Sequence, residues 1–292
     1  MLQFVNVTLN GLVQGMIFAA FALALVLIWR STRIVNFAQG SMAAATTFIA
    51  LAIIQAGQSY WVALVVALLS GFLIGAVIER VVIRPVEGGP ELNAVIVTLG
   101  LFVAIQALIA IVFGSSFQSF TTPFGLRGFT FGDTTILLTP NSLYVIGAVL
   151  VTMLALIALF RFTRVGLAMR ASAFGQEVAR LLGVRVGRML TLGWGLAAVV
   201  GSLSGLLIAG GGLVYPAYMD VIIVSGFVAA VLGGLDSPIG AVVGGLLLGL
   251  VLSYVAGYLS PALVNMSALA ILVVVLLVRP GGLFSSSTAR RA

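Results

Sequence analysis

Long apolar runs follow one another along almost the whole chain, and this pattern constrains the fold more than any other feature. Nine runs reach or approach the roughly 20 residues that a helix needs to cross the hydrocarbon core of a bilayer. They cover residues 7–28, 35–56, 61–78, 93–113, 141–160, 189–209, 221–235, 238–258 and 263–278. The seventh run is short and glycine-bounded, which is typical of a broken or re-entrant helix. The sequence therefore predicts an all-α, polytopic integral membrane protein with about eight to ten transmembrane or re-entrant helices.

The composition indicates that lipid is the main solvent of this chain. Hydrophobic residues make up 62% of the sequence and charged residues only 7%, whereas about a quarter of the residues of a soluble domain are charged. We interpret residues 1–292 as a single transmembrane domain. No basic residue precedes Arg30, so the first run is predicted to be a retained span and not a cleaved signal peptide.

The arginines predict how the chain is oriented. Six of them lie within residues 161–188, whereas the stretch 114–140 carries one arginine and one acid. Because cytoplasmic loops of membrane proteins carry an excess of basic residues, 161–188 is predicted to be cytoplasmic and 114–140 external. Alternation then places 79–91 and the tail after Val278 in the cytoplasm; the tail contains Arg279, Arg290 and Arg291. The external loop is either an ordered cap or partner contact, or a plain connection.

Several classes of chemistry are excluded by what the chain lacks. Cysteine and histidine are absent, which excludes thiol chemistry and the usual zinc and haem ligation. Lysine is absent too, so no phosphate-binding loop of the GxxxxGK[ST] type can form, and any ATPase must be a partner. We therefore expect no cofactor or metal on this chain. The net charge of +7 is attributed to membrane orientation and not to nucleic acid binding.

The seven acids lie at or beyond the ends of the apolar runs. This distribution argues against a proton-coupled carrier, which usually holds an ionisable group within a span. Sodium coupling through backbone carbonyls stays open.

Glycines recur at four-residue spacing, which predicts close approach of helix backbones. The pairs are Gly11/Gly15, Gly71/Gly75, Gly201/Gly205, Gly240/Gly244 and Gly245/Gly249.

One cytoplasmic stretch, "MRASAFGQEVARLLGVRVGR", has helical periodicity. Phe174, Val178, Leu181 and Leu182 fall at i, i+4, i+7 and i+8, which predicts one apolar face on a short helix. Gly183 is placed to end that helix as its cap. Such a helix either lies on the membrane surface, where its arginines favour anionic lipid, or docks into a groove of a cytoplasmic partner.

Five blocks of sequence, in the same order, resemble the permease subunits of branched-chain amino acid ABC importers, and among these the shorter of the two permease types. The blocks are "RIVNFAQG" (33–40), "ERVVIRPV" (79–86), "GLAMRASAFGQEVARLLGV" (166–184), "FVAAVLGGLDSPIGAVVGGLLLGLV" (227–251) and "VLLVRPGGLF" (275–284). The resemblance implies a multi-pass subunit of the bacterial inner membrane. It also implies a second, different permease chain, two ABC ATPase subunits that hold ATP and Mg²⁺, and an extracytoplasmic binding protein.

The resemblance further implies that the cytoplasmic helix couples the permease to its ATPase. The family pattern E-A-A-x3-G is met by Glu177, Ala179 and Gly183, with Val178 in place of the central alanine. The predicted coupling residues are Arg170, Phe174, Glu177, Ala179, Leu182 and Gly183.

Asn36 and Gln39 stand at the start of a small-residue helix and are candidates for the substrate pathway. Amides supply hydrogen bonds to a zwitterionic amino acid without a fixed charge that would hold it too tightly. The alternative is that they cap helix 41–56. The predicted pathway comprises Asn36, Gln39, Gly40, Ser41, Gly233, Gly234 and Gly240, and weaker candidates are Asn10, Gln14, Thr98 and Gln106.

The favoured function is thus an ATP-driven importer of branched-chain or related amino acids. An ABC permease for urea or short amides and an ion-coupled secondary carrier are the alternatives. A passive channel would leave the amphipathic cytoplasmic helix without a purpose.

Overall fold

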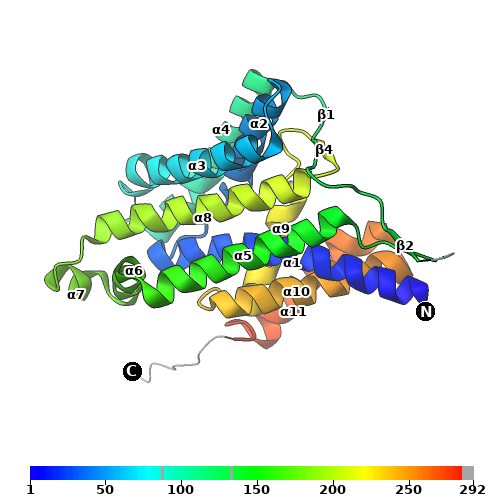
Figure 1. Ribbon diagram of the computed structural model, residues 1–292. Helices are drawn as coiled ribbons and strands as arrows, with labels where there is room; N and C mark the ends of the chain where they lie inside the picture. Colours follow the sequence, from blue (N-terminus) through cyan, green and yellow to red (C-terminus); the bar gives the residue numbers. More distant parts are fainter. Residues whose placement is uncertain (87–88, 132–133, 285–292) are drawn as a thin grey trace.

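The computed structural model describes residues 1–86, 89–131 and 134–284, and Figure 1 shows a bundle built almost entirely of helices. Asp133, Arg290 and Arg291, which enter the orientation analysis, and Glu87, one of the seven acids, lie outside these residues. Within the described residues, seven helical segments are long and apolar enough to span a membrane. The helices concerned are α1 (Leu2–Thr32), α3 (Tyr60–Ile78), α4 (Glu91–Phe113), α5 (Pro140–Phe162), α8 (Val186–Ala209), α10 (Pro238–Tyr254) and α11 (Val264–Val278).

Two shorter apolar helices complete the membrane part. They are α2 (Gln39–Gln55) and α9 (Asp220–Gly233). The 14 residues of α9 extend about 21 Å, which is too short to cross a hydrocarbon core of about 30 Å. The predicted short seventh segment is therefore confirmed, and the seven long and two short helices agree with the predicted range.

Several helices continue into other helical forms. A π-helix, η1 (Glu79–Ile83), extends α3, and a second, η2 (Val255–Leu259), extends α10. The 3₁₀ turn η3 (Pro261–Leu263) leads into α11. The stretch that is predicted to be cytoplasmic forms two helices, α6 (Arg164–Phe174) and α7 (Gln176–Leu181).

Helices α1 and α8 form the centre of the bundle. In each, 78% of the apolar stretch is buried inside the protein, against 11% for α4 and 6% for α11. Helix α10 packs along α1, and α3 packs along α8 (Figure 1). The remaining long helices turn broad apolar faces outward, as helices in contact with lipid do.

The close packing predicted at the glycine pairs is confirmed. A Cβ atom added at Gly249 of α10 would lie 2.3 Å from the Cα of Gly15 on α1, so the two backbones are in direct contact. At Gly75 of α3, an added Cβ would lie 2.6 Å from the carbonyl oxygen of Trp194 on α8. Van der Waals contact of this kind replaces the hydrophobic driving force that helices lack in lipid.

The arginine-rich segments meet at one end of the bundle. Arg84, after α3, donates to the backbone of Gly187 at the start of α8, and Arg33, after α1, pairs with Asp236 in the turn between α9 and α10. Helices α6 and α7 lie at this same end (Figure 1). This grouping agrees with the prediction that these segments share one side of the membrane, and that this side is cytoplasmic stays a prediction.

The loop 114–140 lies at the opposite end and has short strands. β1 (Gln118–Ser119) pairs antiparallel with β4 (Leu213–Val214), and β2 (Phe129–Phe131) pairs antiparallel with β3 (Thr134–Ile136). The strand pairing favours the ordered cap over the plain connection. Whether the cap contacts a partner stays a prediction.

Candidate functional site

The turn between α1 and α2, which we call the polar turn (residues 33–41), brings the predicted amides into the interior. Helix α1 ends at Arg33, which has a left-handed backbone with φ of 59°. Asn36 and Gln39 are almost completely buried. They lie at the start of α2, where α2 meets α8 and α9.

Both amides of the polar turn form hydrogen bonds within the protein. The Asn36 side-chain oxygen accepts from the Ala38 backbone N–H at 3.0 Å, and its Nδ2 donates to Gln39 Oε1 at 3.1 Å. Gln39 Nε2 donates in turn to the Ala197 carbonyl of α8 at 3.0 Å. These bonds satisfy polar groups locally and on α8, but no side chain caps the first turn of α2, so the capping alternative is not confirmed. The pathway role of these amides stays a prediction.

Small residues make room for the polar turn. A Cβ atom added at Gly201 of α8 would lie 2.1 Å from Gln39 Nε2. One added at Gly40 would lie 2.3 Å from the Ile223 side chain of α9. Ser41 donates to the Phe102 carbonyl of α4 at 3.0 Å. The turn therefore connects four helices through contacts that a larger residue would disrupt.

The predicted glycines 233, 234 and 240 form the turn between α9 and α10. An added Cβ at Gly233 would lie 2.0 Å from the Gly240 carbonyl oxygen, so the two helices touch through their backbones. Gly234 has φ of +102°, a conformation that glycine adopts without strain. Phe284 donates its backbone N–H to the Gly233 carbonyl at 3.1 Å. The C-terminal segment is thereby attached to this turn.

An ion pair links the two groups of predicted pathway residues. Asp236, in the turn between α9 and α10, accepts from Arg33 and from Trp29 Nε1 at the end of α1. The polar turn and this glycine turn are therefore neighbours at the same end of the bundle. Among the weaker candidates, Asn10 and Gln14 are exposed on α1, and Gln106 donates to Asp220 at 2.7 Å.

The predicted coupling residues are divided between two helices instead of one: Arg170 and Phe174 lie on α6, Glu177 and Ala179 on α7, and Leu182 and Gly183 directly after α7. The chain breaks at Gly175, so Phe174 ends α6 while Val178 and Leu181 belong to α7. The single continuous helix face expected from the periodicity is thus wrong. Glycine at this position has an extended backbone, which interrupts the helical hydrogen bonding.

The predicted helix end at Gly183 is confirmed. Gly183 has φ of +81°, and its N–H donates to the Arg180 carbonyl at 3.0 Å while Val184 donates to the Ala179 carbonyl at 2.9 Å. These two bonds form a left-handed helix cap. Ala179 is buried against Val186 of α8, so the cap fixes α7 against the membrane helix that follows it.

The apolar residues of α6 and α7 point away from the chain. Phe174 is 98% exposed, Leu181 88% and Leu182 76%. We call this surface, together with Val178, the apolar knob. Glu177 is exposed beside it. Arg170 lies apart, among residues of α1 and α5, and does not belong to the knob.

A buried charge cluster, which sequence analysis missed, connects the start of α8 to η1. Glu79 is fully buried. It accepts from Arg84 at 2.9 Å and from Thr191 at 2.6 Å. Arg84 also donates to Thr191 at 2.8 Å. The apolar span continues to Ile83, so the expectation that every acid lies at or beyond a segment end fails for Glu79.

The signal for this cluster was present in the block "ERVVIRPV". A carboxylate and an arginine five residues apart can meet on a π-helix, whose hydrogen bonds run from i to i+5. An ionisable residue within a membrane span is a functional candidate by default. The π-helix itself has no simple sequence signature, so the pairing could not be inferred from spacing alone.

The helix arrangement defines a multi-pass, all-helical membrane protein. The chain belongs to the family described as branched-chain amino acid transport system / permease component, which matches residues 7–277.

Curated relatives match the chain over nearly its full length. The high-affinity branched-chain amino acid transport system permease protein LivH of Salmonella typhimurium is 28% identical over 97% of this chain and 96% of its own. BraD of Pseudomonas aeruginosa is 29% identical over 94% of this chain and 93% of its own. The solved structure of PsaBC from Streptococcus pneumoniae in complex with Fab aligns with a TM-score of 0.49 and 15% identity, over 94% of this chain and 91% of that one.

Proposed function

We propose that this chain is the membrane-spanning permease subunit of an ATP-driven importer for branched-chain or closely related amino acids in the bacterial inner membrane. The observation that carries the proposal is the family match over residues 7–277. The names of the LivH and BraD relatives support the substrate class. No cofactor is assigned to this chain, and ATP and Mg²⁺ are assigned to the partner ATPase subunits.

The exposed knob supports the assignment of an ATPase partner. Four apolar side chains of the knob are exposed at the arginine-rich end. Exposed apolar residues on a short, capped helix favour insertion into a groove of a partner. We assign two ABC ATPase subunits to this end, a second permease chain to the side of the bundle, and a substrate-binding protein to the ordered cap at the other end.

The same corner offers a route for motion from the ATPase to the membrane helices. A force on α7 passes through buried Ala179 to α8, and α8 is joined to η1 through Thr191, Glu79 and Arg84. Because α3 continues directly into η1, movement of α7 is transmitted to both helices. Energetic coupling of this kind is carried through contiguous packing and hydrogen bonds.

The proposal is tested by reconstitution of the assembled complex. The tagged chain is expressed with its chromosomal neighbours, isolated in mild detergent and placed in vesicles with ATP on the ATPase side. Leucine uptake that requires ATP and the binding protein is expected. Uptake by the chain alone, driven by a sodium or proton gradient, would instead identify a secondary carrier. Competition by urea and short amides distinguishes the related permease types.

The coupling assignment has a test of its own. Glu177→Ala combined with Gly183→Ala should allow assembly and ATP hydrolysis but abolish uptake, because Gly183 requires a left-handed backbone and Glu177 belongs to the coupling pattern. Gly57→Ala is the matched control, since Gly57 also has a positive φ and no neighbour within 4 Å. Normal uptake by the double variant would contradict the assignment.

A further inference from the structure

A groove at the arginine-rich end of the bundle has no role in the function proposed above. It has a volume of about 550 Å³, within the range of small-molecule sites. Its floor is α1, and its walls are α5 and α10, both of which pack on α1. We call it the arginine groove and define it by Leu27 and Arg30 of α1, Ile157 and Arg161 of α5, Arg170 of α6 and Val242 of α10.

The groove is lined by apolar side chains along most of its length and by arginines at one end. Leu23, Leu27 and Arg30 follow one another at helical spacing along the face of α1 that forms the floor. On α5, Ile157 precedes Arg161 by one turn in the same direction. Both helices therefore run from apolar residues in the membrane to an arginine at its cytoplasmic boundary.

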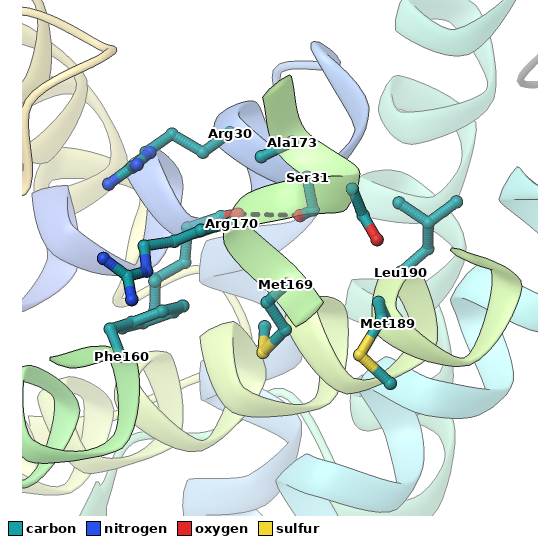
Figure 2. A pocket seen from close by; sticks show the side chains of 10 residues that line it. Arg30, Ser31, Phe160, Met169, Arg170, Ala173, Met189 and Leu190 are labelled. Atoms are coloured by element: carbon teal, nitrogen blue, oxygen red, sulfur yellow. Dashed lines mark hydrogen bonds between the residues drawn. The ribbon is translucent and has the colours of Figure 1, made fainter. Parts of the chain in front are cut away.

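The arginines at this end have no acidic partner of their own. Within residues 1–86, 89–131 and 134–284, no acid forms an ion pair with Arg30, Arg161 or Arg170. Asp236 is the acid that attracts Arg30 electrostatically, but its ion pair is formed with Arg33. Figure 2 views a smaller neighbouring pocket that shares Arg30, Arg170 and Phe160 with the groove. In that view, Arg30 and Arg170 extend to the same side, with Phe160 below them.

The groove also faces the membrane. Only 17% of the apolar stretch of α5 is buried in the protein, and Ile157 is 50% exposed. A free amino acid would occupy only part of such a groove. A lipid would match both parts of the groove: its acyl chain would lie along the apolar side chains of α1 and α5, and its phosphate would lie among the three guanidinium groups.

We propose that the arginine groove is a binding site for an anionic phospholipid of the cytoplasmic leaflet. Arg30, Arg161 and Arg170 hold the phosphate, and Leu27 and Ile157 contact the acyl chain. Basic pockets between transmembrane helices on the cytoplasmic side have the charge and position to bind anionic head groups. The site does not depend on which solute is transported.

The first test compares lipids of different charge. The delipidated complex is titrated with dioleoyl phosphatidylglycerol and with dioleoyl phosphatidylcholine, and bound lipid is counted by native mass spectrometry. Phosphatidylglycerol is expected to bind more tightly. In Arg30→Gln combined with Arg170→Gln, its affinity should fall by about 25-fold, because each basic residue near a lipid phosphate contributes roughly a factor of five. Arg164→Gln combined with Arg188→Gln, two exposed arginines outside the groove, should bind as the native protein does.

A second pair of variants keeps the three arginines and tests the apolar part of the groove with a larger side chain. Ile157→Trp should reduce bound phosphatidylglycerol by several-fold, whereas Leu154→Trp, on an exposed face of α5 outside the groove, should leave it unchanged. Equal binding of the two lipids, or unchanged binding by the Arg30/Arg170 variant, would overturn the proposal.

A partner protein over the groove is the competing occupant, and cysteine labelling distinguishes it. The chain has no native cysteine, so Ile157→Cys introduces a single thiol. A photoreactive probe on that thiol should form adducts with phosphatidylglycerol in the assembled complex. Adducts with a polypeptide instead would show that an acidic or apolar protein surface covers the groove, and the lipid site would be rejected.

Discussion

The apolar knob and the polar turn are at the same end of the molecule, but their side chains are arranged in opposite ways. At the knob, Phe174 and Leu181 are almost fully exposed on the surface of the chain. At the polar turn, Asn36 and Gln39 are buried and hydrogen-bonded to one another and to α8. The chain satisfies its own buried amides at the polar turn and leaves apolar side chains uncovered at the knob.

This difference indicates which region needs another protein. A buried amide without a hydrogen bond costs free energy, so the fold must satisfy it within the chain. An exposed apolar cluster on a short helix is stabilised when a partner or the membrane surface covers it. Substitutions in the interior should therefore destabilise the chain itself, whereas substitutions in the knob should affect assembly.

The largest effect on stability is expected at Arg84. Arg84→Met leaves Glu79 buried without its ion pair, which costs about 3–5 kcal/mol, so the variant should accumulate poorly and melt early in detergent. Arg80→Met is the control, because Arg80 is exposed one turn earlier. Combining Arg84→Met with Glu79→Met should recover most of the stability.

The same double variant tests the route through the charge cluster. If Glu79 and Arg84 transmit motion from α8 to α3, the recovered protein should still lose ATP-driven uptake. Full uptake by a stable double variant would limit this cluster to a structural role.

A smaller loss is expected from overpacking the polar turn. Gly201→Ala places a methyl group 2.1 Å from Gln39 Nε2, and overpacking of this kind costs about 1–3 kcal/mol. A lower melting temperature of the purified chain is expected, with partial recovery when Gln39→Ala is added. Gly100→Ala, where an added Cβ meets nothing within 4 Å, should have no such effect.

Asn36→Leu is expected to lower uptake while the complex still assembles. The change removes the acceptor of the Ala38 N–H and the donor to Gln39, at a cost of about 1–3 kcal/mol for buried groups left unsatisfied. Uptake and co-purification are measured on the same preparation. Failure of assembly would make the amide structural and remove Asn36 from the pathway.

The smallest effect on the chain itself is expected at the knob. Leu181→Ser combined with Leu182→Ser changes only exposed side chains. The free energy of unfolding of this variant should therefore stay within about 0.5 kcal/mol of the native value, and its melting temperature should be nearly unchanged. Recovery of the ATPase subunit in a pull-down should nevertheless fall sharply. Leu69→Ser is the control, because Leu69 is 61% exposed on α3, away from the knob. Unchanged ATPase recovery would contradict the inference that the knob, unlike the polar turn, is needed for assembly with a partner.

The membrane class and most helices could be predicted from the sequence, because they depend on local properties. Runs of apolar residues set the spans, and the glycine at position 183 set the end of α7. The four-residue glycine spacing indicated close packing that α1 and α10 indeed have. Each of these features follows from neighbours within a few turns of one helix.

The contacts that define the site were decided only by the tertiary structure. Gln39 bonds to a carbonyl 158 residues away, and Thr191 to a carboxylate 112 residues away. Helices that are apolar on every side carry almost no periodic signal for which face turns inward. Only packing sets their rotation. The buried Glu79 cluster and the arginine groove both depend on that rotation, and so they could not be inferred from the order of residues.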